Sequence, residues 1–170
     1  MQLRIIRPSL VLLIGPSGSG KSTFARRHFR KTEVVSSDAC RALICDDEAD
    51  QSATKDAFEL LQSILKKRLS RGKLTVVDAT NVQAWARASL LVIARECDVP
   101  CAAIVFDLPP EVCAAHNQAR RGRIVATDVI EQQSRDLRAT LQELPAEGVS
   151  PVHLLRTPQE VDTAVICYEN

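Results

Sequence analysis

The chain has 170 residues, of which 45% are hydrophobic and 25% are charged, and its formal net charge is +1 at neutral pH. This length and apolar content suffice for a sizeable core, so we expect one globular domain over residues 1–170. The near-zero charge excludes a surface that is basic all over, so any nucleic-acid contact must come from local clusters of Lys and Arg. No apolar stretch reaches the roughly 20 residues of a membrane span, so no membrane contact is expected.

The cysteines show neither a CxxC pair nor histidines at zinc-ligand spacing. Several of them lie in apolar runs, which favours buried, free thiols in a reducing, cytoplasmic environment. The six are Cys40, Cys45, Cys97, Cys101, Cys113 and Cys167.

Short apolar runs alternate with amphipathic stretches along the whole chain. This alternation is typical of an α/β fold with a parallel sheet flanked by helices. Runs that are apolar on both faces suit buried parallel strands. Five such strands are predicted, at residues 10–14, 33–36, 74–78, 102–108 and 151–155.

The first predicted strand runs into GPSGSGKS, which fits the phosphate-loop pattern G-x-x-x-x-G-K-[ST]. With a strand before it and an amphipathic helix after it, the loop can point backbone amides at phosphate oxygens. Lys21 can reach the β and γ phosphates, and the hydroxyl of Ser22 can ligate Mg²⁺. A glycine-rich turn with a chance lysine is the disfavoured alternative. The predicted nucleotide-binding residues are Gly15, Pro16, Ser17, Gly18, Ser19, Gly20, Lys21, Ser22 and Thr23.

The second predicted strand is followed directly by SSDACR. Ligands of open α/β sheets bind at the carboxyl ends of the strands, so this position favours a functional role. Asp38 is a candidate general base for an attacking hydroxyl, and Arg41, one helical turn later, is a candidate clamp for a substrate phosphate or carboxylate. The alternative is a helix N-cap at Asp38 with a solvated Arg41, and Ser37 could also be the cap.

The segment DAFELLQSILKKRLSRG carries apolar residues at helical spacing and predicts a helix that stops at Gly72. Its basic end, KKRLSRGK, and the cluster ARRHFRK both lie near predicted helix ends. We interpret them as solvated surface, which could still touch the phosphates of a polymeric substrate.

The third predicted strand ends in TVVDATN. Asp78 is the candidate metal-supporting carboxylate, acting through water, while Thr80 and Asn81 are expected to bind substrate. The alternative is that one of these three residues caps the next helix.

An arginine-rich segment, HNQARRGRIVATD, lies between two predicted helices, where a lid over about residues 116–128 is expected. Its arginines could close over the nucleotide and stabilise charge on the transferred phosphoryl group. A solvated helix end is the competing interpretation. The residues are Arg120, Arg121 and Arg123, of which Arg120 and Arg123 are the favoured pair.

Two capping patterns are predicted late in the chain. Asp128 with Glu131 is expected to open one helix, and Thr157 with Pro158 is expected to open a last helix that runs to within a few residues of the end.

Together, GPSGSGKSTFA, VVSSDACR, LTVVDATN and the arginine-rich lid resemble the 5′-hydroxyl polynucleotide kinase family, over essentially the whole chain. The similarity is greatest to the amino-terminal kinase module of bacterial polynucleotide kinase-phosphatases, which heal and seal RNA ends. This family has a P-loop phosphotransferase fold and transfers the γ phosphate of ATP or another nucleoside triphosphate, with Mg²⁺, to 5′-OH ends of RNA or DNA.

The resemblance implies roles for single residues. Lys21 and Ser22 match the phosphate and magnesium ligands, and Asp38 matches the general base. Arg41 matches the contact to the phosphate 3′ of the attacked nucleoside, and Arg120 and Arg123 match lid arginines. Bacterial members often have an arginine where this chain has His116, which is itself expected to be a surface or packing residue. The resemblance further implies phosphatase and ligase modules in the parent protein and a possible homodimer.

Two other functions stay open. A phosphate-loop small-molecule kinase would use Asp38 in the same way, and Arg41 favours an acceptor that already carries a phosphate. A nucleotide-binding switch module without phosphoryl transfer would not depend on Asp38.

Overall fold

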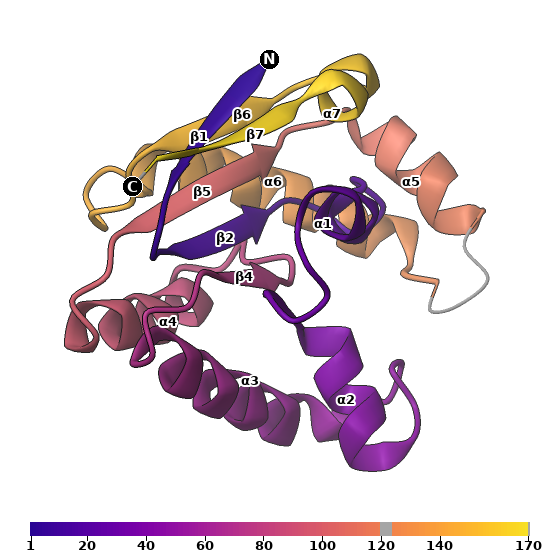
Figure 1. Cartoon of the computed structure of the whole chain (residues 1–170). Coiled ribbons are helices and arrows are strands. Elements are labelled where there is room, and N and C mark those ends of the chain that lie inside the picture. Colours follow the sequence, from indigo (N-terminus) through magenta and orange to yellow (C-terminus); the bar gives the residue numbers. More distant parts are fainter. Residues whose placement is uncertain (120–123, 170) are drawn as a thin grey trace.

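The computed structural model describes residues 1–119 and 124–169, and it has an α/β fold in which helices cover a central parallel sheet (Figure 1). The sheet has five strands in the order β3-β4-β2-β5-β6, and all neighbouring pairs are parallel. The five predicted strands are confirmed, with small shifts at their ends. They are β2 (Leu10–Ile14), β3 (Val34–Ser36), β4 (Thr75–Asp78), β5 (Cys101–Phe106) and β6 (Val152–Leu155).

The helices follow the strands as a parallel sheet requires. They are α1 (Lys21–His28), α2 (Ser37–Cys45), α3 (Thr54–Leu69), α4 (Ala84–Glu96), α5 (Pro110–Gln118), α6 (Thr127–Glu143) and α7 (Pro158–Thr163). A short 3₁₀ turn, η1 (Gln51–Ala53), precedes α3. None of the helices in the described part of the chain is long and apolar enough to cross a membrane.

The alternation of side chains along β2 divides the core into two clusters. Leu10, Leu12 and Ile14 pack with apolar residues of α3, α4 and α6 on one face of the sheet. Val11 and Leu13 face the other side, where α1 and the chain ends cover them. Every residue of β2 is buried, as expected for a central parallel strand.

The predicted helix over the segment ending at Gly72 is confirmed as α3. Its apolar face is buried, and the helix ends at Leu69. Gly72 follows with a φ of +64°, a conformation that glycine adopts without the strain of a side chain.

Helix α2 is capped by Ser36, whose Oγ accepts from the Ala39 backbone N–H at 3.3 Å. Both alternatives considered from the sequence, Asp38 and Ser37, are therefore wrong as caps, because each already lies inside the first turn. The Asp38 carboxylate is therefore not the cap, and it accepts from Arg41 instead.

Of the two helix caps predicted late in the chain, one is wrong and one is confirmed. Asp128 lies in the first turn of α6, after Ala126 at the N-cap position, so the predicted Asp128 cap is wrong. Thr157 caps α7 as predicted, because its Oγ1 accepts from the Glu160 backbone N–H at 3.1 Å and Pro158 starts the helix.

The prediction that the last helix runs to the chain end is also wrong. Helix α7 ends at Thr163, and β7 (Val165–Glu169) pairs in parallel with β1 (Gln2–Ile6) in a separate two-stranded sheet. The inward side chains of β1, Leu3 and Ile5, are fully buried against the core, so the two chain ends close one side of the molecule.

The cysteines of the described residues are all free thiols. Cys40, Cys101 and Cys113 are buried, while the other three are half-buried. Burial raises the pKa of Cys101 to about 12 and that of Cys113 to about 11, so both thiols stay protonated and behave as apolar groups.

Candidate active site

One cavity of about 700 Å³ lies at the carboxyl edge of the central sheet and gathers most of the residues predicted from sequence. Gly15 and Pro16 are not among the residues that line it. The predicted residues that line it are Ser17, Gly18, Ser19, Gly20, Lys21, Ser22, Thr23, Asp38, Arg41, Asp78, Thr80 and Asn81.

The phosphate loop joins β2 to α1 and is packed tightly against α5. Gly18 has a φ of +83°, and a Cβ built there would lie 2.0 Å from the backbone oxygen of Cys113. His116 of α5 places its Nδ1 3.1 Å from the Gly18 oxygen. The path of the loop therefore depends on the absence of a side chain at Gly18.

Lys21 starts α1 and is only 8% exposed. Its ammonium group donates to the backbone oxygens of Gly15 at 2.8 Å and Pro16 at 2.7 Å, and to the hydroxyl of Ser19 at 3.3 Å. These contacts hold the charge of Lys21 within the hollow of the loop, where the phosphates of a nucleotide would lie.

Helix α6 also contacts the loop, which the sequence did not suggest. The backbone N–H of Ser17 donates to the Oε1 of Gln133 at 2.8 Å. A glutamine inside an amphipathic helix carries no motif, so only the fold reveals this link.

Asp78 ends β4 beside the phosphate loop and is 7% exposed. Burial raises its pKa, although the positive charge of Lys21 and a hydrogen bond from the Ser22 hydroxyl act in the opposite direction. A hydroxyl and a carboxylate in contact are oxygen donors of the kind that Mg²⁺ prefers, and a nearby dication would stabilise the buried charge. Ser22 and Asp78 therefore fit a magnesium site completed by phosphate oxygens and water.

Thr80 and Asn81 shape the loop after β4. The backbone oxygen of Thr80 accepts from the Gly15 N–H at 2.9 Å. Asn81 is 3% exposed with a φ of +52°, and its Nδ2 donates to the backbone oxygen of Leu13 at 2.8 Å. Helix α4 begins only after Gln83, so the alternative that Asp78, Thr80 or Asn81 caps it is wrong.

Asp38 and Arg41 form an ion pair on the α2 side of the cavity. Arg41 donates through Nη1 to the Asp38 carboxylate and, at 3.0 Å, to the backbone oxygen of Glu48. The Arg41 side chain is 8% exposed and that of Asp38 is 32% exposed. The alternative of a solvated Arg41 is wrong, because its side chain is buried.

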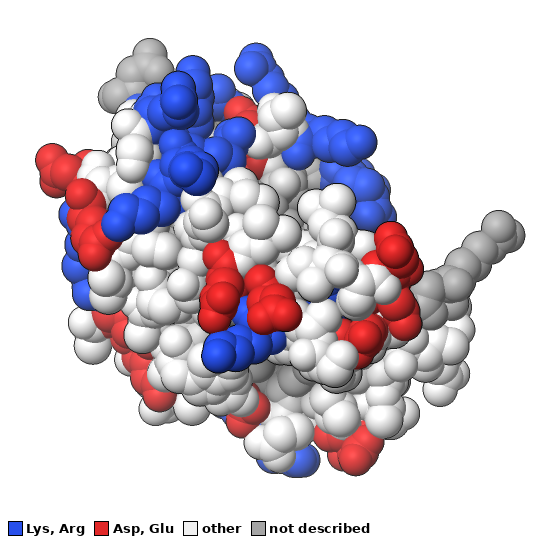
Figure 2. Space-filling view, turned by 90° about the horizontal axis from the view of Figure 1, so that it is seen from below, with Lys and Arg blue, Asp and Glu red and all other residues white. Residues whose placement is uncertain are grey.

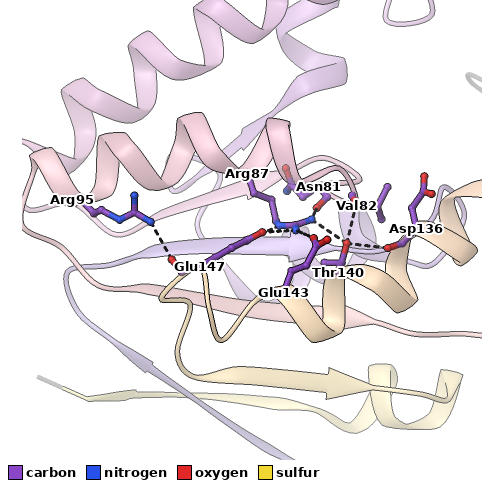
Figure 3. Close-up of polar contacts among 8 residues, drawn as sticks. All are labelled: Asn81, Val82, Arg87, Arg95, Asp136, Thr140, Glu143 and Glu147. Carbon is purple, nitrogen blue, oxygen red and sulfur yellow. Dashed lines mark hydrogen bonds and ion pairs between the residues drawn. The ribbon is translucent and has the colours of Figure 1, made fainter.

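Arg87 was missed in the sequence, although among the described residues it is the largest fully buried side chain. Figure 3 shows its polar contacts. From α4, its Nη1 donates to the Asn81 backbone oxygen at 3.0 Å and to the Thr140 hydroxyl at 3.0 Å. Its other nitrogens donate to Glu143 at 2.8 Å and to both carboxylate oxygens of Glu147, at 2.8 and 2.6 Å.

The Arg87 network ties the loop after β4 to α6. Thr140 also donates to the Val82 backbone oxygen at 2.8 Å, so two side chains hold that loop against α6 (Figure 3). Burial disfavours the charge of Arg87, but the hydrogen bonds and charges of the two glutamates outweigh it and raise the pKa of Arg87. Since α6 contacts the phosphate loop through Gln133, one helix supports both sides of the cavity.

The predicted lid arginines, Arg120, Arg121 and Arg123, lie outside the described residues. The chain on either side of them is tied together by Asn117, which is 2% exposed. Its Nδ2 donates to the Val125 backbone oxygen at 2.7 Å, and its Oδ1 accepts from the Val125 N–H at 3.0 Å. The end of α5 and the approach to α6 are thus held at a fixed separation.

Although the net charge of the chain is only +1, its surface has local basic areas. Most of the Lys and Arg side chains visible in Figure 2 gather toward its upper part, whereas Asp and Glu are spread over the rest. From the ARRHFRK cluster, Arg26 and Arg27 reach the cavity lining, and Arg27 pairs with Asp162 at 3.2 Å. That cluster is therefore partly a wall of the site and not only solvated surface.

A family model described as an AAA domain matches residues 10–144. The protein named Transcription factor bHLH140 of Arabidopsis thaliana is 27% identical over an alignment of 167 residues, which covers 94% of this chain and 17% of that protein. Among solved structures, a chain of the Pnkp1/Rnl/Hen1 RNA repair complex is 24% identical with a TM-score of 0.69, over 82% of this chain and 47% of that chain. The Mycobacterium tuberculosis APS kinase CysC, solved with AMPPNP and APS, is 19% identical with a TM-score of 0.55, over 93% of both chains.

Proposed function

The chain belongs to the AAA domain family and has a P-loop kinase-type fold, and from this premise we propose that it is a polynucleotide 5′-hydroxyl kinase. In this reaction the γ phosphate of ATP, or of another nucleoside triphosphate, is transferred to a 5′-OH end of RNA or DNA. The proposal combines a site for a phosphate donor with a site for an acceptor that carries both a hydroxyl and a phosphate.

One observation carries the proposal. A carboxylate and a buried arginine, Asp38 and Arg41, form an ion pair in the same cavity as the Lys21 ammonium and the Ser22–Asp78 pair. The donor phosphates would lie over the phosphate loop. An acceptor entering from the α2 side would then meet Asp38 first, because its side chain is the more exposed of the pair.

The proposed chemistry needs one proton acceptor. The acceptor hydroxyl oxygen forms a bond to the γ phosphorus while the bond from that phosphorus to the β–γ bridging oxygen breaks, and ADP leaves. Asp38 orients the hydroxyl and takes its proton, which then passes to solvent. Phosphoryl transfer depends mainly on positioning and on stabilisation of charge. The reaction therefore needs no catalytic group of another type than the base and the charged groups described here.

The donor side is built from charge and backbone. Lys21 and the loop amides would hold the β and γ phosphates at the positive end of α1. Ser22 and, through water, Asp78 would hold Mg²⁺, which neutralises charge on the phosphates when bound. Arg120 and Arg123 remain the proposed lid contacts to the same phosphates.

Arg41 favours a polynucleotide over a small molecule as the acceptor. A guanidinium beside the base suits an acceptor whose phosphate lies next to its reacting hydroxyl, as in the first linkage after a 5′-OH end. The same side chain orients the Asp38 carboxylate. Thr80 and Asn81, on the loop after β4, are proposed to border the acceptor.

A small-molecule kinase is the second candidate. It is supported by the similarity to an APS kinase over 93% of both chains, since that kinase was solved together with the small molecule APS. Asp38 would act as the base in that case too. The two candidates differ in whether the acceptor must be part of a chain.

Larger assemblies are a further part of the proposal. This chain spans about half of the matched chain in the RNA repair complex and about a sixth of the curated relative. We propose that it is the kinase module of a longer protein with phosphatase and ligase modules, which acts in nucleic-acid repair in the cytoplasm and forms homodimers.

The test is transfer of label from γ-labelled ATP with Mg²⁺ to oligonucleotides that end in 5′-OH or in 5′-phosphate. The proposal expects label on the 5′-OH strand alone, and label that forms about 10²- to 10⁴-fold more slowly with the Asp38→Asn variant. Label on small alcohols with none on the 5′-OH strand would overturn it in favour of the second candidate. Nucleotide binding with no transfer to any acceptor would indicate a switch module.

A further inference from the structure

Trp85 is the single tryptophan of the chain, and it is 69% exposed. It nevertheless lines the cavity that holds the phosphate loop. Aromatic side chains are common in the lining of ligand pockets, so an exposed indole at this cavity is a candidate contact for a ligand.

The indole is held in place from one side. Phe58 of α3 meets it edge to face, with ring centroids 6.3 Å apart and planes at 62°. Phe58 lines the same cavity and is half-buried against the core cluster. The Trp85 ring is thus positioned by packing while most of its surface stays available for a further contact.

The position of Trp85 places it with the acceptor and not with the donor. Figure 1 shows α2 and α3 below the open end of the sheet and α5 and α7 above it, with the start of α1 between them. Trp85 is the second residue of α4, and Phe58 of α3 contacts its ring. Helix α3 also packs against α2, the helix that carries Asp38 and Arg41. The cavity lining from the upper group comes from His116 and from α7.

We propose that Trp85, supported by Phe58, is a stacking platform for the nucleobase of the acceptor's terminal nucleotide. The inference deepens the proposed function and rests on it. A flat indole face binds any of the bases, since each presents a π surface, so the contact would add affinity without sequence preference. Asp38 would then engage the sugar hydroxyl, Arg41 the adjoining phosphate and Trp85 the base of one nucleotide unit.

The lone tryptophan gives a direct readout. The intact protein is titrated with a 5′-OH oligonucleotide while tryptophan fluorescence is recorded, then with the same oligonucleotide abasic at its first position, and then with AMPPNP alone. We expect strong quenching by the base-bearing end and little by the other two. Equal quenching by the abasic end, or strong quenching by AMPPNP alone, would overturn the inference.

Kinetics provide the second arm. Trp85→Ala should raise KM for the base-bearing oligonucleotide about tenfold, leave KM for the abasic one unchanged, and leave KM for ATP unchanged. Trp85→Phe should retain most of the affinity, because it keeps a ring. Val92→Ala, an exposed apolar position on the same helix that does not line the cavity, is the matched control and should behave as wild type.

These outcomes separate the two proposals. If wild type phosphorylates base-bearing and abasic 5′-OH ends with the same KM and Trp85→Ala changes neither, the platform is disproved and the polynucleotide kinase stands. If wild type transfers phosphate to neither oligonucleotide, the proposed function is disproved, and the stacking platform, which rests on it, is disproved as well.

Discussion

The guanidinium of Arg41 donates to the carboxylate of Asp38 one turn earlier on α2, and both line the cavity of the phosphate loop. Ser36 caps the helix, so neither residue of the pair is needed to start it. The pair is therefore a candidate for chemistry and not merely part of a helix end.

Asp38→Asn removes the proposed proton acceptor while keeping the shape of the side chain. We expect the transfer rate to fall by about 10²- to 10⁴-fold, because general-base catalysis contributes on that scale. Binding of AMPPNP, measured by calorimetry, should stay close to wild type. The matched control is Asp46→Asn at the exposed end of α2, which should transfer normally.

A fall in AMPPNP affinity equal to the fall in rate would contradict this role for Asp38. It would show that the carboxylate supports the nucleotide and not the acceptor.

Arg41→Lys keeps a positive charge but loses the planar fork that binds a phosphate with two hydrogen bonds. We expect KM for a 5′-OH oligonucleotide to rise several-fold, and the effect to shrink on a 5′-OH acceptor without a 3′ phosphate. Steady-state kinetics on the two acceptors test this. An equal effect on both would leave Arg41 as a positioning residue for Asp38 alone.

Gly18→Ala should abolish nucleotide binding. The new Cβ would lie 2.0 Å from the Cys113 backbone oxygen, so the phosphate loop must move away from α5. Gly72→Ala is the control, because Gly72 also has a positive φ but has no atom within 4 Å of a built Cβ. That variant should lose about 1–2 kcal/mol of stability and bind nucleotide normally.

Should both glycine variants bind AMPPNP equally in calorimetry, the close contact between the loop and α5 would not matter for binding. Should both fail, backbone strain rather than the contact would explain the loss.

Arg87→Ala should lower the free energy of unfolding by about 2–4 kcal/mol, because it empties a fully buried site and removes the Arg87 donor from the Asn81 backbone oxygen and the Thr140 hydroxyl. Glu143 and Glu147 are partly exposed, so water can replace part of what they lose. Arg95→Ala is the control. Arg95 lies on the same helix and is exposed, and among the described residues its guanidinium donates only to the Glu147 backbone oxygen, at 3.1 Å. Its loss should therefore cost about 1 kcal/mol or less.

Urea unfolding of the two variants measures this difference. Equal midpoints would show that the buried network does not stabilise the fold. A stable Arg87→Ala protein with weakened transfer would instead show that Arg87 acts chiefly by placing the loop after β4.

The sequence was sufficient wherever a local pattern determines structure. A strand, a glycine-rich turn and a helix follow one another from Leu10 to His28, so neighbouring residues alone locate the phosphate loop. The same holds for α3, whose apolar residues recur at helical spacing and whose end is marked by Gly72.

Long-range pairing could not be predicted in the same way. Strands β1 and β7 are short and come from opposite ends of the chain. Neither can be predicted from its own residues, because only their pairing makes them strands. Arg87 looked like an ordinary helix residue, because its partners on α6 are distant in sequence. Gln133 was missed for the same reason, and the cap at Ser36 was missed because three neighbouring polar residues compete for that role.

The most direct measurement is a competition in one reaction. Wild-type protein with γ-labelled ATP and Mg²⁺ is given a 5′-OH oligonucleotide together with an equal concentration of small acceptors, including nucleosides and APS, and the products are separated by size. The proposed function predicts that label accumulates on the oligonucleotide, at its 5′ end, and that Asp38→Asn slows its formation by about 10²- to 10⁴-fold. Label that accumulates on a small acceptor while the oligonucleotide stays unlabelled would contradict it.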